Sequence, residues 1–90
     1  MSNDNIVKAF ERGETKGHTS YCESVGQYRL HIIGNVLYSY KTPIAIRLDN
    51  GNVILNNTKY SSTTSHIQSK IRQICNVIEE LNYNEFIKMI

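Results

Sequence analysis

Two strand-like segments separated by Asn50-Gly51 constrain the fold of this chain more than any other feature. In Ile44–Asp49 the large apolar side chains recur at every second residue, opposite Ala45, Arg47 and Asp49. Val53–Asn56 returns after the pair, with Val53 and Leu55 on one face and Ile54 and Asn56 on the other. A period of two residues is that of a β-strand. Asn and Gly both tolerate the positive φ that a tight hairpin turn requires. The sequence therefore predicts an antiparallel hairpin over residues 44–56.

A second hairpin is predicted just upstream, because Gly34-Asn35 separates the strand-like segments Tyr28–Ile33 and Val36–Tyr40. Tyr21–Val25 is a weaker, mixed strand candidate. Thr42-Pro43 interrupts the pattern between the two hairpins, and proline is tolerated at the start of a strand or on an edge strand. We therefore expect four strands joined in an antiparallel meander.

Helices are predicted at both ends of the chain. Residues 3–12 place Ile6, Val7 and Phe10 on one side, with Gly13 as the stop signal. Residues 64–81 form a longer helix with an apolar stripe of period 3.6. The stripe consists of Ile67, Ile71, Ile74, Cys75, Ile78 and Leu81. One or two further helical turns follow over residues 83–90, whose apolar side chains either pack on the first helix or form a contact surface.

Together these elements predict a single α+β domain over residues 1–90. It comprises a short N-terminal helix, a four-stranded antiparallel meander sheet and a long C-terminal helix packed on one face of the sheet. No apolar run approaches the ~18 residues of a membrane span, and Met1–Asn5 lacks the basic and apolar regions of a signal peptide. We therefore expect a cytoplasmic protein in which Cys22 and Cys75 are free thiols.

Hydroxyl, cationic and histidine side chains are concentrated between the last strand and the start of the predicted long helix. We name this segment the basic corner. Six hydroxyl side chains run consecutively over Tyr60–Ser65. With the backbone N–H groups of a helix start and nearby cations, they would bind an anion such as a nucleotide, a nucleic-acid phosphate or an acidic protein patch. In the alternative interpretation the hydroxyls only cap the helix and the cations are solvated. The candidate residues of the basic corner are Lys59, Tyr60, Ser61, Thr63, Thr64, Ser65, His66, Lys70 and Arg72.

Two tyrosines extend the candidate site, since Tyr38 and Tyr40 share one face of a predicted strand and Tyr60 follows nearby. Such rings serve as stacking platforms for nucleic-acid bases or as hot spots of a protein interface. In the alternative interpretation, these amphipathic rings only cover the hydrophobic core of the sheet. His18, His31 and His66 lack the spacing of metal ligands. We therefore expect no metal, no cofactor and no enzymatic activity.

Two motifs resemble those of a group of small phage, plasmid and archaeal proteins. Residues 37–45 read Leu-Tyr-Ser-Tyr-Lys-Thr-Pro-Ile-Ala, and residues 56–68 contain Asn56 followed by Tyr-Ser-Ser-Thr-Thr-Ser and Gln68. The family pattern is L-Y-S-Y-x-T-x-I-A, then N-x-x-x-Y-S-x-T-T-S-x-x-Q. Many members read Ser-Lys-His-Gln where this chain has Ser65-His66-Ile67-Gln68. That shift of the histidine argues against His66 as a strict ligand.

The resemblance implies an origin in a mobile genetic element and carries no established activity. Small phage proteins often inhibit host defence. By that analogy we expect an anti-CRISPR-like binding protein that occludes a host protein or ribonucleoprotein. The alternative is a nucleic-acid or nucleotide binder that uses the basic corner. With either function, a homodimer or higher oligomer would cover the apolar side chains of residues 83–90.

Overall fold

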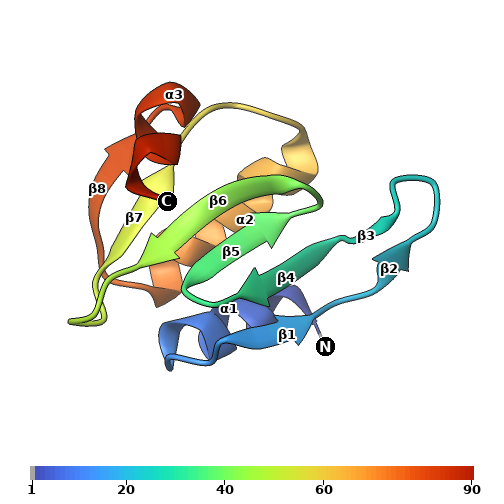
Figure 1. Ribbon diagram of the computed structural model, residues 1–90, viewed down its shortest axis with the longest axis horizontal. Helices are drawn as coiled ribbons and strands as arrows, with labels where there is room; N and C mark the ends of the chain where they lie inside the picture. Colours follow the sequence, from blue (N-terminus) through green and yellow to red (C-terminus); the bar gives the residue numbers. More distant parts are fainter. Residues whose placement is uncertain (1) are drawn as a thin grey trace.

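The computed structural model describes residues 2–90 as a six-stranded sheet with helices on both of its faces (Figure 1). The strand order is β1-β4-β5-β6-β7-β8, and a separate two-stranded ladder pairs β2 with β3. All neighbours are antiparallel except β7 and β8, which run parallel. The elements are α1 (Asn3–Glu11), β1 (Lys16–His18), β2 (Tyr21–Cys22), β3 (Gln27–Tyr28), β4 (Leu30–Ile33), β5 (Val36–Ser39), β6 (Thr42–Arg47), β7 (Val53–Asn56), α2 (Ser62–Ile74), β8 (Val77–Leu81), α3 (Tyr83–Phe86) and the 3₁₀ turn η1 (Ile87–Met89).

The N-terminal helix is confirmed with nearly the predicted bounds. The side chain of Ser2 accepts a hydrogen bond from the backbone N–H of Asn5, which satisfies one of the unpaired donors at the helix start. Ile6, Val7 and Phe10 are fully buried, as their spacing predicted. Burial of this stripe fixes α1 against the sheet.

The helices α1 and α2 cover one face of the sheet, behind the strands in Figure 1. Their apolar stripes meet inward-facing strand residues in the main hydrophobic core. Its largest fully buried members are Ile6, Phe10, Leu30, Leu37, Ile44, Leu55 and Ile71. Cys75, the residue that follows α2, also belongs to this core.

A second, smaller core lies on the opposite face, where the C-terminal segment crosses in front of β6 and β7 (Figure 1). Phe86 of α3 is fully buried against Val36, Ile46 and Ile54. Both sides of β6 are therefore covered, and Ile44, Ala45 and Ile46 are all buried. Because both faces of β6 are buried, the alternation of its side chains does not show which face lies against α1 and α2.

The prediction of a long C-terminal helix is wrong. Helix α2 ends at Ile74, and Cys75 is its C-cap in an extended conformation. Residues 77–81 instead form β8 along the outer edge of β7. Val77 and Ile78 are β-branched and favour a strand, and β7 offers an unpaired row of backbone groups there. Ile78 has the spacing of the helical stripe, but its side chain is 53% exposed.

The four-stranded meander is also wrong, because the sheet gains a strand at each edge. The parallel strand β8 extends it beyond β7, so the sheet is mixed. At the other edge, residues 16–18, over which no strand was predicted, form β1, paired antiparallel with β4. Three residues with a central glycine carry no alternation that marks them as a strand. Their conformation is imposed by the open edge of β4.

The two predicted hairpins are present, with different turn geometries. Gly34-Asn35 is a two-residue loop with positive φ at Gly34, the first central position, as a type II′ turn requires. At the other hairpin, the N–H of Gly51 donates to the carbonyl of Leu48, and Gly51 has φ +88°. That turn is centred one residue earlier than Asn50-Gly51, and glycine takes the left-handed position after it.

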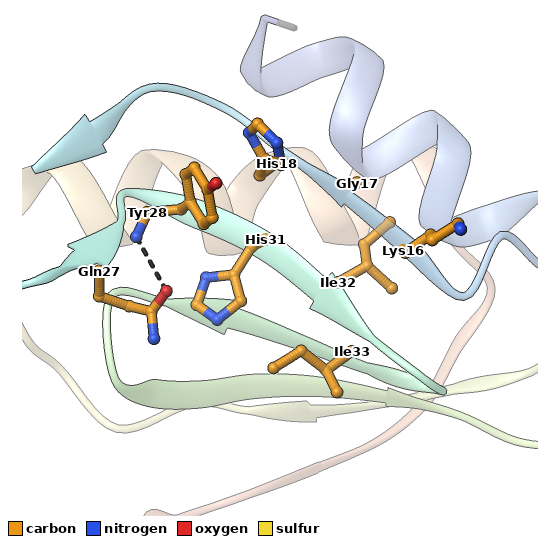
Figure 2. A pocket seen from close by; sticks show the side chains of 8 residues that line it. All are labelled: Lys16, Gly17, His18, Gln27, Tyr28, His31, Ile32 and Ile33. Atoms are coloured by element: carbon orange, nitrogen blue, oxygen red, sulfur yellow. Dashed lines mark hydrogen bonds between the residues drawn. The ribbon is translucent and has the colours of Figure 1, made fainter.

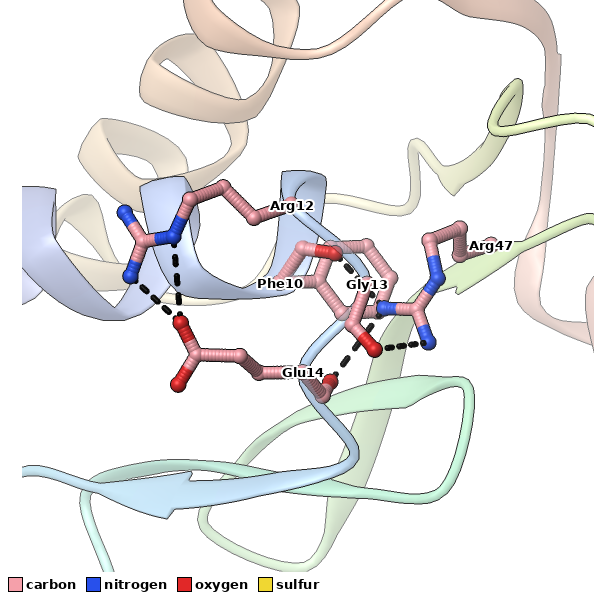
Figure 3. A network of polar contacts seen from close by, with 5 residues as sticks. All are labelled: Phe10, Arg12, Gly13, Glu14 and Arg47. Carbon is pink, nitrogen blue, oxygen red and sulfur yellow. Dashed lines mark hydrogen bonds and ion pairs between the residues drawn. The ribbon is translucent and has the colours of Figure 1, made fainter.

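The end of α1 is held against the sheet by Arg47, the last residue of β6. Its guanidinium donates to the backbone carbonyls of Phe10, Gly13 and Glu14 at 2.6, 3.4 and 3.3 Å (Figure 3). It also lies 5.1 Å from the centre of the Phe10 ring. A cation satisfies the unpaired carbonyls at a helix C-terminus. Arg12 pairs with Glu14 on the outside of the same turn.

We predict that Phe86→Ala destabilises the protein by about 3–5 kcal/mol, because the substitution removes the ring at the centre of the second core. Ile87→Ala, at a neighbouring exposed residue, should change the free energy of unfolding by less than about 0.5 kcal/mol. Urea unfolding of both variants measures the difference. Equal free energies of unfolding for the two variants would show that packing of Phe86 in the second core does not stabilise the fold.

Candidate functional site

The hydroxyls of the basic corner lie at the start of α2, where one of them caps the helix. Ser61 is the N-cap, and its Oγ accepts from the N–H of Thr64 at 3.3 Å. Thr64 is buried, and its hydroxyl lies 3.4 Å from Ser39 of β5. Thr63 is exposed, and Ser65 is half-buried. Part of the hydroxyl run is therefore used to position α2 against the sheet.

Both helix cations of the basic corner form ion pairs with neighbouring elements. Lys70 pairs with Asp4 of α1, and Arg72 makes two hydrogen bonds, of 3.0 and 2.9 Å, to the carboxylate of Glu80 on β8. Lys70 lowers the pKa of Asp4. The Arg72 bond likewise lowers the pKa of Glu80, and Glu80 raises the pKa of Arg72. These charges are largely neutralised within the protein. Lys59 and His66 are exposed.

Two buried amides of the second motif hold the loop between β7 and α2. Gln68 donates from Nε2 to the backbone carbonyls of Asn56 and Thr58 at 2.7 and 3.0 Å. Asn56 donates from Nδ2 to the carbonyl of Pro43 and to the hydroxyl of Tyr60, both at 3.0 Å. Gln68 is 4% exposed and Asn56 fully buried. The motif therefore builds a polar clamp inside the protein.

Four predicted site residues do come together in one depression of about 210 Å³, which we name the hydroxyl hollow. Tyr40 occupies a turn with φ +55°, not the predicted strand, and its hydroxyl accepts from Arg29. Tyr38 lies elsewhere, against the second core around Phe86. The hydroxyl hollow is lined by Ser39, Tyr40, Thr42, Tyr60, Ser61 and Thr64.

On the sheet face that carries Phe86, α3 covers Val36 of β5 but leaves β1, β4 and the rest of β5 uncovered, and aromatic side chains run across this half. His18 and Tyr28 stack at 3.8 Å between ring centres, and His31 stacks on Tyr38 at 5.2 Å. The ring centres of Tyr28 and His31 are 6.2 Å apart. The ring centres of Tyr21 and Tyr28 are 5.2 Å apart, in a T-shaped arrangement. We name these five residues the aromatic band.

A second depression of about 210 Å³, the histidine hollow, opens beside this band. Figure 2 shows His18 and Tyr28 along one side, Gln27 at one end and Lys16 toward the other, with His31 between them. The exposed side chain of Ile33 completes the lining. The walls are therefore mainly aromatic and apolar, with a few polar groups, as in a small-molecule site.

His31 is the unusual polar group of this hollow. It is only 5% exposed, and its Nδ1 has no hydrogen-bond partner within residues 2–90. Burial lowers the pKa of His31; the backbone carbonyl of Tyr28 acts in the opposite direction, and His18 adds a further lowering. The ring is therefore neutral near pH 7, with one N–H and one acceptor nitrogen.

Of the aromatic band, only Tyr38 was among the predicted site residues. The pairing of His31 with Tyr38 follows from the Gly34-Asn35 turn, because a two-residue loop places residues 31 and 38 opposite each other. That signal was present in the sequence. His18 joins the band through its register with His31 in β1, a strand without a recognisable pattern.

The two cysteines differ in their surroundings. Cys22 lies in the β2–β3 hairpin, and the Ser24 hydroxyl at 3.3 Å lowers the pKa of its thiol, as does the backbone N–H of Val25. Burial raises the pKa of Cys75 to about 11.

We predict that iodoacetamide at about pH 8 modifies Cys22 well before Cys75, because only a thiolate reacts. Peptide mass mapping over time measures both rates, and equal rates would contradict this difference.

We also predict that the free energy of unfolding falls as the pH drops from about 7.5 to about 5.5. The unfolded histidine titrates near 6.5 and takes up a proton before the buried His31, whose pKa is lowered in the folded state. The slope should be at most about 1.4 kcal/mol per pH unit. His31→Phe should flatten the profile, whereas His66→Gln, at an exposed histidine, should leave it unchanged. A His31→Phe profile like that of the wild type would be the contrary result.

Within residues 2–90, no helix combines the length and apolar character needed to cross a membrane. Nor do the described His, Cys, Asp and Glu side chains gather in a group of three that would hold a metal ion. Polar groups that could contact a ligand gather in the two hollows. Their positions derive from the β4–β5 hairpin, the edge strand β1 and the start of α2.

No curated protein and no solved structure matches the chain. One family profile does, and it spans residues 2–87, almost the whole length. The match includes both cores and both hollows, so it concerns the complete fold. The chain therefore belongs to DUF8033, a family of unknown function.

Proposed function

We propose that the protein is a non-enzymatic binding protein that acts by covering the surface of a protein partner. The uncovered half of the sheet is its recognition surface. The observation that carries the proposal is the exposure of large apolar side chains on it and next to it: Ile33 on β4 is 59% exposed, and Tyr21 of the aromatic band, in the separate β2–β3 ladder, is 51% exposed. Tyrosines surrounded by apolar contacts are frequent hot spots of protein interfaces.

The charge distribution favours a protein over a polynucleotide as the partner. Binding to a nucleic-acid strand relies on several cations that contact successive phosphates. Arg12, Lys70, Arg72 and Lys88 each pair with an acidic side chain. Of the side chains that line the histidine hollow, all within the described chain, only Lys16 is a cation. The alternative of an anion site in the basic corner has less support, since Asp4 and Glu80 neutralise its helix cations.

The biological role we propose is inhibition of a host defence system, in which the uncovered sheet half occludes a host protein or ribonucleoprotein. The resemblance of the two motifs to small phage, plasmid and archaeal proteins supports a mobile-element origin. Small size supports it as well, because such inhibitors need only one binding surface. In this role the polar clamp of the second motif keeps the fold rigid, and the aromatic band makes the contact.

We predict that expression of the protein restores phage plaques in at least one strain of a panel, each strain carrying a single defence system such as CRISPR. Ile33→Glu should abolish the effect, because a charge at the centre of an apolar contact weakens binding by about 2 kcal/mol or more. Plaque counts at equal expression levels measure it. If no strain of the panel loses its defence, the proposed role fails.

The matched control is Ile78→Glu, which makes the same change at an isoleucine of similar exposure on the opposite edge strand β8. This variant should protect phage as well as the wild type does. Equal loss in both variants would point to a general effect of added charge. Full protection by Ile33→Glu would exclude the uncovered sheet half as the contact surface.

A further inference from the structure

The histidine hollow has the dimensions of a site for one small, flat ligand. Its volume of about 210 Å³ is below the range of drug-sized pockets, about 300–1,000 Å³. Stacked rings form one side of it, and Ile33 adds an apolar surface (Figure 2). A planar ring is the shape that makes most contact with such walls.

His31 points to a ligand with a hydrogen-bonding edge. Its Nδ1 is buried and lacks a partner among residues 2–90, and native proteins rarely leave such a group unsatisfied. The free energy lost by this nitrogen on folding is regained when a bound molecule supplies a donor or an acceptor. A ring without polar edge atoms would leave Nδ1 unpaired.

Gln27 provides the second contact for such an edge. Its Oε1 accepts from the backbone N–H of Tyr28 at 2.9 Å, which orients the amide and leaves Nε2 as a donor. Figure 2 shows this amide beside the His31 ring. Gln27 therefore offers one donor, and His31 one imidazole nitrogen, within the lining of the same hollow. Adjacent donors and acceptors of this kind are what the edge of a nucleobase pairs with.

We propose that the histidine hollow binds the base of a nucleoside monophosphate. The base lies against the ring of Tyr28, its edge pairs with Gln27 Nε2 and His31 Nδ1, and its phosphate is held by Lys16. Base-to-tyrosine stacking is tolerant of sequence and is common in nucleotide sites. One cation matches one phosphate group, whereas a strand would need more. This small-ligand site shares Ile33 and part of the aromatic band with the surface proposed above to contact a protein, but it needs no protein partner and is tested separately.

The test is titration of the full-length protein with each of the four ribonucleoside monophosphates, followed by ¹H–¹⁵N NMR. We expect saturable shifts at Gln27, Tyr28 and His31 for at least one nucleotide. Gln27→Ala should weaken binding roughly tenfold, because it removes one hydrogen bond to the edge. Gln73→Ala, at an exposed glutamine of α2, should bind like the wild type. Lys16→Glu should also weaken binding, by repelling the phosphate.

Other ligands separate the parts of the proposal. Phenyl phosphate keeps a ring and a phosphate but lacks the polar edge, so it should bind at least roughly tenfold more weakly than the best nucleotide. A short single-stranded oligonucleotide should bind no more tightly than the monophosphate. Much tighter binding of the oligonucleotide would mean that the ligand is a strand, and the proposal would be wrong.

Several other outcomes would overturn the proposal. These are the absence of saturable shifts with any nucleotide, shifts confined to the start of α2, and wild-type affinity in Gln27→Ala. The fold of each variant is checked by circular dichroism. Because nucleotide binding is read on the isolated protein and host-defence inhibition is read in cells, failure of one leaves the other intact.

Discussion

The clamp made by Gln68 and Asn56 is the interaction on which the rest of the structure depends. Each amide donates two hydrogen bonds inside the protein, mainly to backbone carbonyls. Together they fix the loop that carries the chain from β7 to α2. A satisfied bond of this kind contributes about 1 kcal/mol, and an unsatisfied buried amide costs more. Because the loop has one conformation, α2 begins at a fixed place over the sheet.

The position of α2 in turn determines where the next element, β8, pairs with the sheet. With its start fixed by the clamp and by Ser61, the helix ends beside the outer edge of β7, where β8 pairs in parallel. The Arg72–Glu80 ion pair joins the helix to that strand, and the Lys70–Asp4 pair joins it to α1. The cations that suggested an anion site in the sequence therefore hold three elements together. Both pairs are partly exposed, so each contributes little stability alone.

Unequal cover of the two sheet faces creates the candidate binding surface. On one face α1 and α2 bury most of the apolar side chains, whereas on the other α3 reaches the region around Phe86 only. On this face His18 of β1 and Ile33 of β4 are exposed and Tyr38 of β5 is half-buried, whereas His31 is buried. Apolar surface left open by a fold this small favours binding, because covering it releases ordered water.

Local chemistry in the sequence determined α1 and the two central hairpins, and it placed the start of α2, predicted at residue 64, close to its observed position at Ser62. These signals act over only a few residues: caps such as Ser2, turns such as Gly34-Asn35, and strand periodicity. They can therefore be recognised from the sequence before the tertiary structure is known. The tertiary structure alone decided β1, β8 and the meeting of His18 with the histidine hollow. Edge strands form because a neighbouring strand presents unpaired backbone groups, and no side-chain pattern in residues 16–18 encodes that. The partners of Lys70 and Arg72 likewise depended on which elements the completed sheet brought within reach.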